Sequence, residues 1–184
     1  MIDYGRLDRS LRYYESNGFK RIESPWTVTK DVSDITKPPN GTDWEIIGKD
    51  KVLVASGEQS FLYLYLKGFL PPGRYQTITP CFREEPFDRT HTKYFIKNEL
   101  IITDDVSEES LKFVINTCKQ FYENELESVV DIIETKEGFD LEVSGIEIGS
   151  YGIRSCEYLK CIYGTGLAEP RMTFIKNTLK NGIS

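Results

Sequence analysis

Three separate segments carry arginine, acidic and aromatic residues in patterns that suit a phosphorylated ligand. Residues 80–85 read PCFREE, residues 94–100 read YFIKNEL, and residues 163–171 read YGTGLAEPR. The guanidinium group of arginine stays charged and can bind two phosphate oxygens at once. An aromatic ring offers a face on which a nucleobase can stack. These residue types therefore favour nucleotide-phosphate chemistry, although each short pattern by itself is common.

The hydrophobic pattern predicts an α+β domain whose sheet holds these segments. Apolar residues at helical spacing, followed by an Asn-Gly stop, predict a helix over residues 3–17. Residues 74–83 and 94–103 predict two antiparallel strands on either side of a polar loop. Ser107 is a typical N-cap for an amphipathic helix that ends near residue 126.

Weaker patterns predict the remaining elements. We expect a helix at residues 58–66, a polar loop at residues 30–50, and a final helix that follows the glycine-rich residues 164–166 and holds Pro170 in its first turn. Short strands are predicted at residues 19–22, 51–55, 129–134, 139–143 and 146–150. Together these elements predict one antiparallel sheet flanked by helices, in a single domain over residues 1–184.

Composition and charge restrict the class of protein. The chain has 184 residues, of which 39% are hydrophobic and 28% charged, as is typical of one soluble globular domain. No apolar run reaches the length of a membrane span, and no signal-peptide pattern is found. Four cysteines at scattered spacings indicate reduced thiols and a cytoplasmic location. The net charge of −6, with no basic arm, makes a large nucleic acid an unexpected partner, although a small basic patch remains open.

Taken in order along the chain, several segments resemble the signature motifs of the class II aminoacyl-tRNA synthetases. Residues 18–25 resemble motif 1, residues 80–100 resemble motif 2, and residues 163–171 resemble motif 3. The sequences CFR, FIKNEL and GTGLAEPR are most similar to those of the seryl-type enzymes. The resemblance covers nearly the whole chain. It implies ATP-dependent activation of a carboxylate, that of a small amino acid such as serine, glycine or alanine.

The resemblance implies roles for individual residues in catalysis and ATP binding. Arg83 corresponds to the arginine that contacts the α-phosphate and the substrate carboxylate, and Arg171 to the arginine that holds the γ-phosphate. Glu85 corresponds to the acidic residue that recognises the adenine amino group. Phe95 corresponds to the ring stacked under adenine. These four residues are therefore the expected ATP site.

Two further groups of residues would assist ATP binding. His91, the only histidine, lies with Arg89 and Lys93 in the motif 2 loop, where any of the three would be in reach of the β- or γ-phosphate. Gly164 and Gly166 would let the backbone approach the nucleotide closely. A surface position without a ligand is the alternative interpretation of His91.

The resemblance also implies a metal site and an amino-acid site. Glu147 and Ser150 correspond to the glutamate and serine that hold Mg²⁺ against the phosphates, and oxygen ligands fit that ion. The sequence SGE at residues 56–58 stands where the family has Thr-x-Glu, which binds the ammonium group. The residues expected at the amino-acid end are Glu58, Lys97, Glu99 and Cys161.

The sequence departs from conventional synthetases in lacking a coiled-coil arm for tRNA. Relatives without the arm load carrier proteins and hold a zinc ion with two cysteines and a glutamate; here Cys161 and Glu99 fall near two of those positions and Ser56 near the third. The acceptor is therefore left open among a carrier protein, a small molecule, a protein lysine and tRNA. Motif 1 implies a homodimer.

Simpler interpretations of the same residues remain. Arg83 and Glu85 would also suit an ordinary cross-strand ion pair, Phe95 a core position, and Glu147 a solvent-facing one. The whole chain would also suit a non-catalytic synthetase paralog that acts as a regulatory or accessory subunit. The presence of both Arg83 and Arg171 favours retained nucleotide chemistry.

Overall fold

The computed structural model describes residues 1–37, 41–84 and 92–181, and one sheet dominates this part of the chain. Seven strands form that sheet in the order β1-β5-β6-β10-β9-β8-β7 within the described residues. Their bounds are β1 Lys20–Arg21, β5 Arg74–Phe82, β6 Tyr94–Ile102, β10 Lys160–Glu169, β9 Ile146–Ser155, β8 Phe139–Val143 and β7 Asp131–Glu134. The predicted sheet is found, but it is mixed rather than wholly antiparallel, because β1 pairs in parallel with β5.

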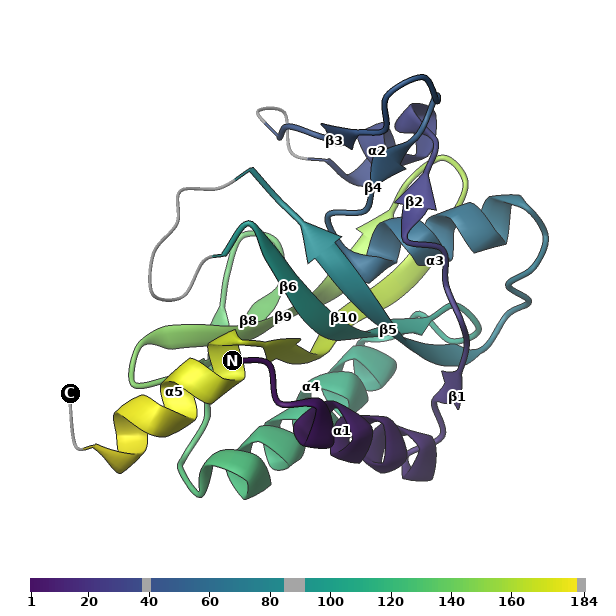
Figure 1. Ribbon diagram of the computed structural model, residues 1–184. Coiled ribbons are helices and arrows are strands. Elements are labelled where there is room, and N and C mark those ends of the chain that lie inside the picture. The colour runs from purple at the N-terminus through teal and green to yellow at the C-terminus, as the bar shows by residue number, and fades with distance from the viewer. Residues whose placement is uncertain (38–40, 85–91, 182–184) are drawn as a thin grey trace.

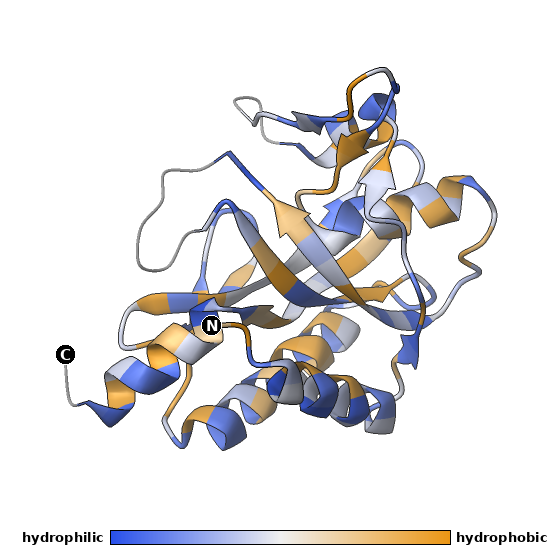
Figure 2. Cartoon of the chain, viewed as in Figure 1, coloured by the Kyte–Doolittle hydropathy of each residue, from blue (hydrophilic) through white to orange (hydrophobic). Residues whose placement is uncertain are grey.

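Three helices cover one face of this sheet. They are α1 (Tyr4–Ser16), α4 (Glu108–Leu126) and α5 (Arg171–Lys180), and α1 and α4 lie together below the sheet in Figure 1. Both α1 and α4 begin as the sequence indicates, since Asp3 accepts a hydrogen bond from the Arg6 amide at 2.9 Å and Ser107 accepts one from the Ser110 amide at 3.2 Å. Hydrophilic and hydrophobic residues are interleaved along α4 and α5, as expected of helices with one buried side (Figure 2).

A smaller layer lies over the opposite face. It contains α2 (Lys30–Thr36), α3 (Gly57–Leu66) and a three-stranded sheet formed by β2 (Thr27–Val28), β4 (Val52–Leu53) and β3 (Trp44–Glu45). Successive side chains of β6 point to opposite faces of the sheet and therefore pack in different layers. Leu100 and Ile102 pack in the core below the sheet, whereas Ile101 packs in a second core above it.

Two of the predicted elements are wrong. Residues 30–50 are not a simple loop, because α2 and β3 lie within them. Residues 164–166 do not lead directly into a helix, because they lie inside the ten-residue strand β10, and Pro170 is the N-cap of α5 rather than a residue of its first turn. A bulge between Thr165 and Leu167 interrupts the pairing of β10 with β6.

Two remaining predictions concern the thiols and the membrane. All four cysteines are described, and each has a free thiol. Among residues 1–37, 41–84 and 92–181, no helix has both the length and the apolar character needed to cross a membrane.

Candidate active site

A cleft of about 590 Å³ lies on the face of the sheet opposite α1 and α4. Strands β5, β6, β9 and β10 and the first residues of α3 and α5 contribute to its lining. It brings together nine residues that the sequence singles out: Ser56, Glu58, Arg83, Phe95, Lys97, Glu99, Glu147, Ser150 and Arg171. Three of these residues come from β6, because alternate side chains of a strand point to the same face and every second one from Phe95 to Glu99 faces the cleft.

Arg83 lies against Phe95 at one end of the cleft. Its guanidinium carbon is 5.2 Å from the centroid of the Phe95 ring. Its Nε donates to the carbonyl oxygen of Ala55 at 3.0 Å, and its backbone amide donates to Lys93 O at 2.9 Å. The contact with Ala55 fixes the direction of the side chain, so a cation and an aromatic face are presented together.

Arg171 and Glu147 form an ion pair at another part of the rim. Nη1 of Arg171 is 3.1 Å from Oε1 of Glu147, and Arg171 is the first residue of α5. Ser150 lies two strand positions beyond Ile148 on β9 and also lines the cleft, opposite Asp140 of β8. Burial raises the pKa of the Asp140 carboxyl, and a hydrogen bond with Ser150 opposes the rise.

Lys97 and Glu99 form a buried ion pair at the floor of the cleft. Nζ of Lys97 is 2.9 Å from Oε1 of Glu99, and the Gly57 amide at the start of α3 donates to Oε2 of Glu99 at 3.2 Å. A Cβ at Gly57 would lie 2.9 Å from Cβ of Glu99, so the approach of α3 to β6 requires glycine. Both oxygens of Glu99 are thus engaged within the protein.

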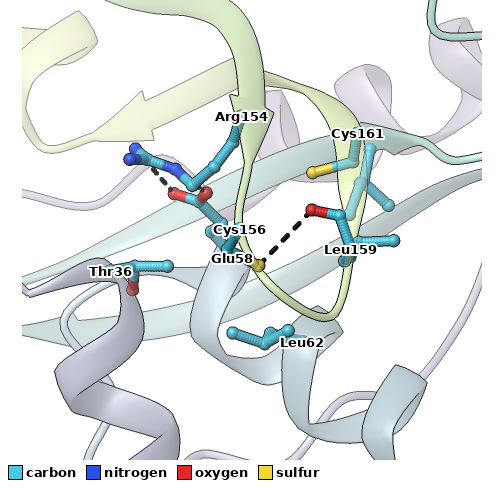
Figure 3. Close-up of a pocket in the computed structure, with 8 residues that line it drawn as sticks. Thr36, Glu58, Leu62, Arg154, Cys156, Leu159 and Cys161 are labelled. Carbon is cyan, nitrogen blue, oxygen red and sulfur yellow. Dashed lines mark hydrogen bonds and ion pairs between the residues drawn. The ribbon is translucent and has the colours of Figure 1, made fainter.

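Glu58 pairs with a residue that the sequence analysis missed, Arg154 of β9. Nη2 of Arg154 is 3.5 Å from Oε2 of Glu58, its Nε contacts the other carboxylate oxygen, and Figure 3 shows the two groups facing each other. The guanidinium carbon of Arg154 is 5.1 Å from the centroid of the Tyr163 ring. Burial raises the pKa of Glu58, and the charge of Arg154 opposes the rise. Alternation along β9 could have revealed Arg154, but the predicted strand ended at residue 150.

A small side pocket lies behind the Glu58–Arg154 pair. Its lining adds Thr36, Leu62, Ile101, Cys156, Leu159 and Cys161 to those two residues (Figure 3). The pocket measures about 10 Å³, which is room for about one water molecule. Cys161 therefore lies beyond the main cleft, and burial raises the pKa of its thiol to about 12.

Several predicted residues stay outside the site or outside the described residues. Glu85, Arg89 and His91 fall within residues 85–91, which the structure does not describe. Lys93 pairs with Glu84 and is absent from the described lining of the cleft. The described part of the chain also contains no group of three or more histidine, cysteine, aspartate or glutamate side chains placed to hold a metal ion.

Gly164 and Gly166 have a packing role that differs from the predicted one. A Cβ at Gly164 would lie 2.8 Å from the Tyr151 ring, and a Cβ at Gly166 would lie 2.7 Å from the Tyr14 ring. At both glycines, the rings of buried tyrosines below the sheet therefore lie too close to the backbone to leave room for a side chain. The hydroxyls of Tyr14 and Tyr151 donate to the carbonyl oxygens of Gly166 and Thr165 at 2.7 and 2.6 Å, and thereby satisfy backbone groups at the bulge.

Solved structures of synthetases share the fold. The seryl-tRNA synthetase of Pyrococcus horikoshii complexed with ATP aligns with a TM-score of 0.77 and 16% identity, over 96% of this chain and 50% of that one. The cytoplasmic serine–tRNA ligase of Naegleria fowleri in complex with AMP aligns with a TM-score of 0.71 and 16% identity, over 92% and 51%. The pyrrolysyl-tRNA synthetase of Desulfitobacterium hafniense gives 0.74 and 15%, over 97% and 69%. The chain thus spans about half the length of the two seryl enzymes.

Sequence comparison identifies the family. No curated protein matches the chain. A family model described as the class II core domain of tRNA synthetases (F) matches residues 55–178, which include β5, β6, β9, β10 and nearly all of α5. This match covers more than half of the chain and contains every residue that was named above as lining the cleft. The chain therefore belongs to the class II tRNA synthetase core domain family.

Proposed function

We propose that the protein activates an amino acid with ATP to give an aminoacyl-adenylate and pyrophosphate, and then transfers the aminoacyl group to an acceptor. Membership of the class II core family supports ATP-dependent activation in general. The observation that carries the proposal for this chain is the convergence of Arg83, Phe95 and Arg171 on one cleft, because these are the phosphate- and base-binding residue types.

The reaction needs charge neutralisation more than proton transfer. An oxygen of the amino acid carboxylate attacks the α-phosphorus of ATP, the bond from that phosphorus to the bridging oxygen breaks, and pyrophosphate leaves with the electron pair. The carboxylate is already ionised, so a general base is not required. Arg83 would hold the carboxylate and the α-phosphate together, and Arg171 would bind the γ-phosphate in place of Glu147.

The residues at the rim fit Mg²⁺. Glu147 has a side chain that is 48% exposed and Ser150 lines the same cleft, so a carboxylate and a hydroxyl oxygen are available to an ion that also binds phosphate oxygens. Bound there, Mg²⁺ would neutralise charge on the phosphates. When Arg171 turns to the γ-phosphate, Glu147 would be released for the ion.

The proposal leaves the acceptor of the aminoacyl group open. A carrier protein, a small molecule, a protein lysine and tRNA all remain consistent with a cleft that is open at its rim.

We propose a homodimer built through residues 18–25, because this segment resembles motif 1, and Trp26 beside it is 60% exposed. Sedimentation equilibrium of the purified chain tests the dimer, and a monomer at every concentration would contradict it.

ATP–pyrophosphate exchange with each of the twenty amino acids tests the function. We expect exchange that depends on one or two amino acids and is lost in Arg83→Ala. Arg74→Ala is the matched control, since Arg74 begins strand β5, which Arg83 directly follows, and its guanidinium carbon lies 5.1 Å from the centroid of the Phe113 ring, outside the described lining of the cleft. Exchange retained in Arg83→Ala would contradict its assignment. ATP binding without exchange for any amino acid would contradict activation and support the accessory-subunit alternative.

A further inference from the structure

The backbone at residues 55–59, which leads into α3, contacts two charged residues of the cleft. The Ala55 carbonyl oxygen accepts a hydrogen bond from Nε of Arg83 at 3.0 Å. Two residues later, the Gly57 amide donates to Oε2 of Glu99 at 3.2 Å. The directions of both side chains therefore depend on how firmly this short segment is held.

Gln59 holds the first residue of the segment in place. Its Oε1 accepts the Ala55 amide at 2.8 Å. Residues 56–59 read SGEQ, the pattern of a capping box, in which a glutamine at the third helical position bonds the amide of the N-cap residue. The N-cap is Ser56, but the glutamine bonds one residue earlier, and the Ser56 side chain does not cap the described first turn of α3. Ala55 is thus bound at its amide by Gln59 and at its carbonyl by Arg83.

Gln59 is fixed in turn by α2. Its Nε2 donates to Oγ of Ser33 at 2.9 Å and to the Ser33 carbonyl oxygen at 3.4 Å. The Ser33 hydroxyl donates to Oδ1 of Asp43 at 2.8 Å, and Nζ of Lys37 contacts Oδ2 of Asp43 at 2.6 Å. Gln59 and Ser33 are 2% and 0% exposed. A chain of hydrogen bonds therefore connects the smaller layer with Ala55.

Gln59 acts through the backbone rather than on a ligand. It lies in the wall of the cleft, but the oxygen and the nitrogen of its amide group are both bonded within the protein, and the residue is buried. Without this oxygen the partly buried Ala55 amide would lack its acceptor, which is costly, and would turn toward another partner. Because two rotatable bonds separate the amide of a residue from its carbonyl, the acceptor of Arg83 would turn as well.

We propose that Gln59 is a positioning residue, which directs Arg83 toward the α-phosphate through the backbone of Ala55. This inference rests on the proposed function and adds a residue to its site. The bond to Ala55 is one of several contacts that hold Arg83, the Phe95 ring being another. A displaced guanidinium group matters most in the transition state, where charge develops on the phosphate. The loss of Gln59 should therefore lower kcat more than it raises KM for ATP.

Pyrophosphate exchange compares two buried glutamines. Gln59→Met removes the amide group and keeps the length of the side chain. Gln76→Met is the matched control, because Gln76 is 0% exposed, donates to the Leu11 carbonyl oxygen at 2.9 Å and accepts from Asn98 at 3.0 Å, yet is outside the described lining of the cleft. We expect kcat to fall about 100-fold in Gln59→Met with KM for ATP within about threefold, and both to stay within about threefold in Gln76→Met. Equal kcat in the two variants would overturn the inference.

A double variant shows whether Gln59 acts through Arg83. Arg83→Lys keeps a positive charge without the planar guanidinium fork. We expect Gln59→Met to lower kcat less than about threefold once Arg83 is replaced, because the same contact can be lost only once. Independent residues contribute additively to the free energy, so two full effects that multiply in the double variant would argue that Gln59 does not work through Arg83 and would overturn the inference.

Ser33→Ala guards against a Gln59→Met variant that does not fold. It removes one bond that holds Gln59 and leaves the bond between Gln59 and Ala55. We expect a smaller decrease in kcat, about tenfold, again with an unchanged KM for ATP. Circular dichroism establishes that the variant is folded. A folded Ser33→Ala protein with the kcat of the wild type would overturn the inference.

A measurement on the protein without substrate separates this inference from the proposed function. The Nε–H group of Arg83 gives its own signal in ¹⁵N NMR, which is assigned by its loss in Arg83→Lys. We expect its hydrogen exchange with solvent to be at least about tenfold faster in Gln59→Met than in the wild type, and unchanged in Gln76→Met. An unchanged rate in Gln59→Met would overturn the inference and leave activation standing. If the wild type exchanges pyrophosphate with no amino acid, activation is overturned, and the hydrogen-exchange rate still decides whether Gln59 holds Arg83.

Discussion

Arg6 of α1 and Glu169, the last residue of β10, form an ion pair in which the side chains are 5% and 0% exposed. The same guanidinium group donates to Oγ1 of Thr173 at 3.0 Å, and Oε2 of Glu169 accepts the Thr173 amide at 3.3 Å. The pair thus supplies hydrogen-bond partners to the hydroxyl and the backbone amide of Thr173 in the first turn of α5. Since Arg171 begins that helix, Arg6 and Glu169 hold the position from which Arg171 reaches the cleft.

Removal of Arg6 should destabilise the protein strongly. Arg6→Ala leaves the buried Glu169 carboxylate without its cation, and such losses cost about 3–5 kcal/mol. Burial already raises the pKa of Glu169, so the charged form depends on this partner. Urea unfolding measures the change. Arg12→Ala is the control, because its pair with Asp8 is exposed and should contribute little. Similar midpoints for the two variants would contradict the prediction.

Glu125 should make stability depend on acid pH. Its hydrogen bond with Arg9 lowers its pKa below the ordinary value of 4.5. The unfolded chain therefore binds the proton more readily, so this contribution is complete above about pH 4.5 and is lost as pH falls through the lower folded pKa. Urea midpoints near neutral pH and at about pH 3 should differ less in Glu125→Gln than in the wild type. An equal acid loss in both proteins would argue against this carboxylate.

Phe95 should contribute to ATP affinity through its ring. Base stacking on an aromatic side chain contributes about 1–3 kcal/mol, so Phe95→Leu should weaken ATP binding about tenfold or more in calorimetry. The neighbouring Tyr94 projects to the other side of β6 and is 64% exposed, which makes Tyr94→Leu a matched control with unchanged affinity. Equal affinities of Phe95→Leu and the wild type would remove Phe95 from the ATP site.

The hydroxyl of Tyr14 should stabilise the bulge of β10. Tyr14→Phe leaves the Gly166 carbonyl without its donor at 2.7 Å in a fully buried position, and an unsatisfied buried group costs about 1–3 kcal/mol. Thermal and urea unfolding should both show the loss. Tyr4→Phe removes a hydroxyl from a residue that is 68% exposed and should have little effect. If Tyr14→Phe unfolds at the wild-type midpoint, the hydrogen bond is not a source of stability.

Local patterns in the sequence determined the central hairpin and the long helix, whereas the resemblance to the class II synthetases named most of the residues that line the cleft. Alternation placed Phe95, Lys97 and Glu99 on one face of β6, and the cap at Ser107 placed the start of α4. Such signals are local, because a strand has a period of two and a helix cap is read within four residues. The order of the motifs along the chain was enough to indicate the family.

Only the tertiary structure decided which charges meet and what the glycines do. The partner of Glu58 is Arg154 and the partner of Glu169 is Arg6, and these pairs join residues far apart in the sequence. The segment at residues 164–166 lies inside a central strand rather than at the start of a helix, and its missing side chains make room for Tyr14 and Tyr151. Where both faces of a strand are buried, long-range packing outweighs the local preference of its residues for a turn or a strand. The sequence periodicity of such a segment therefore does not show which structure it adopts.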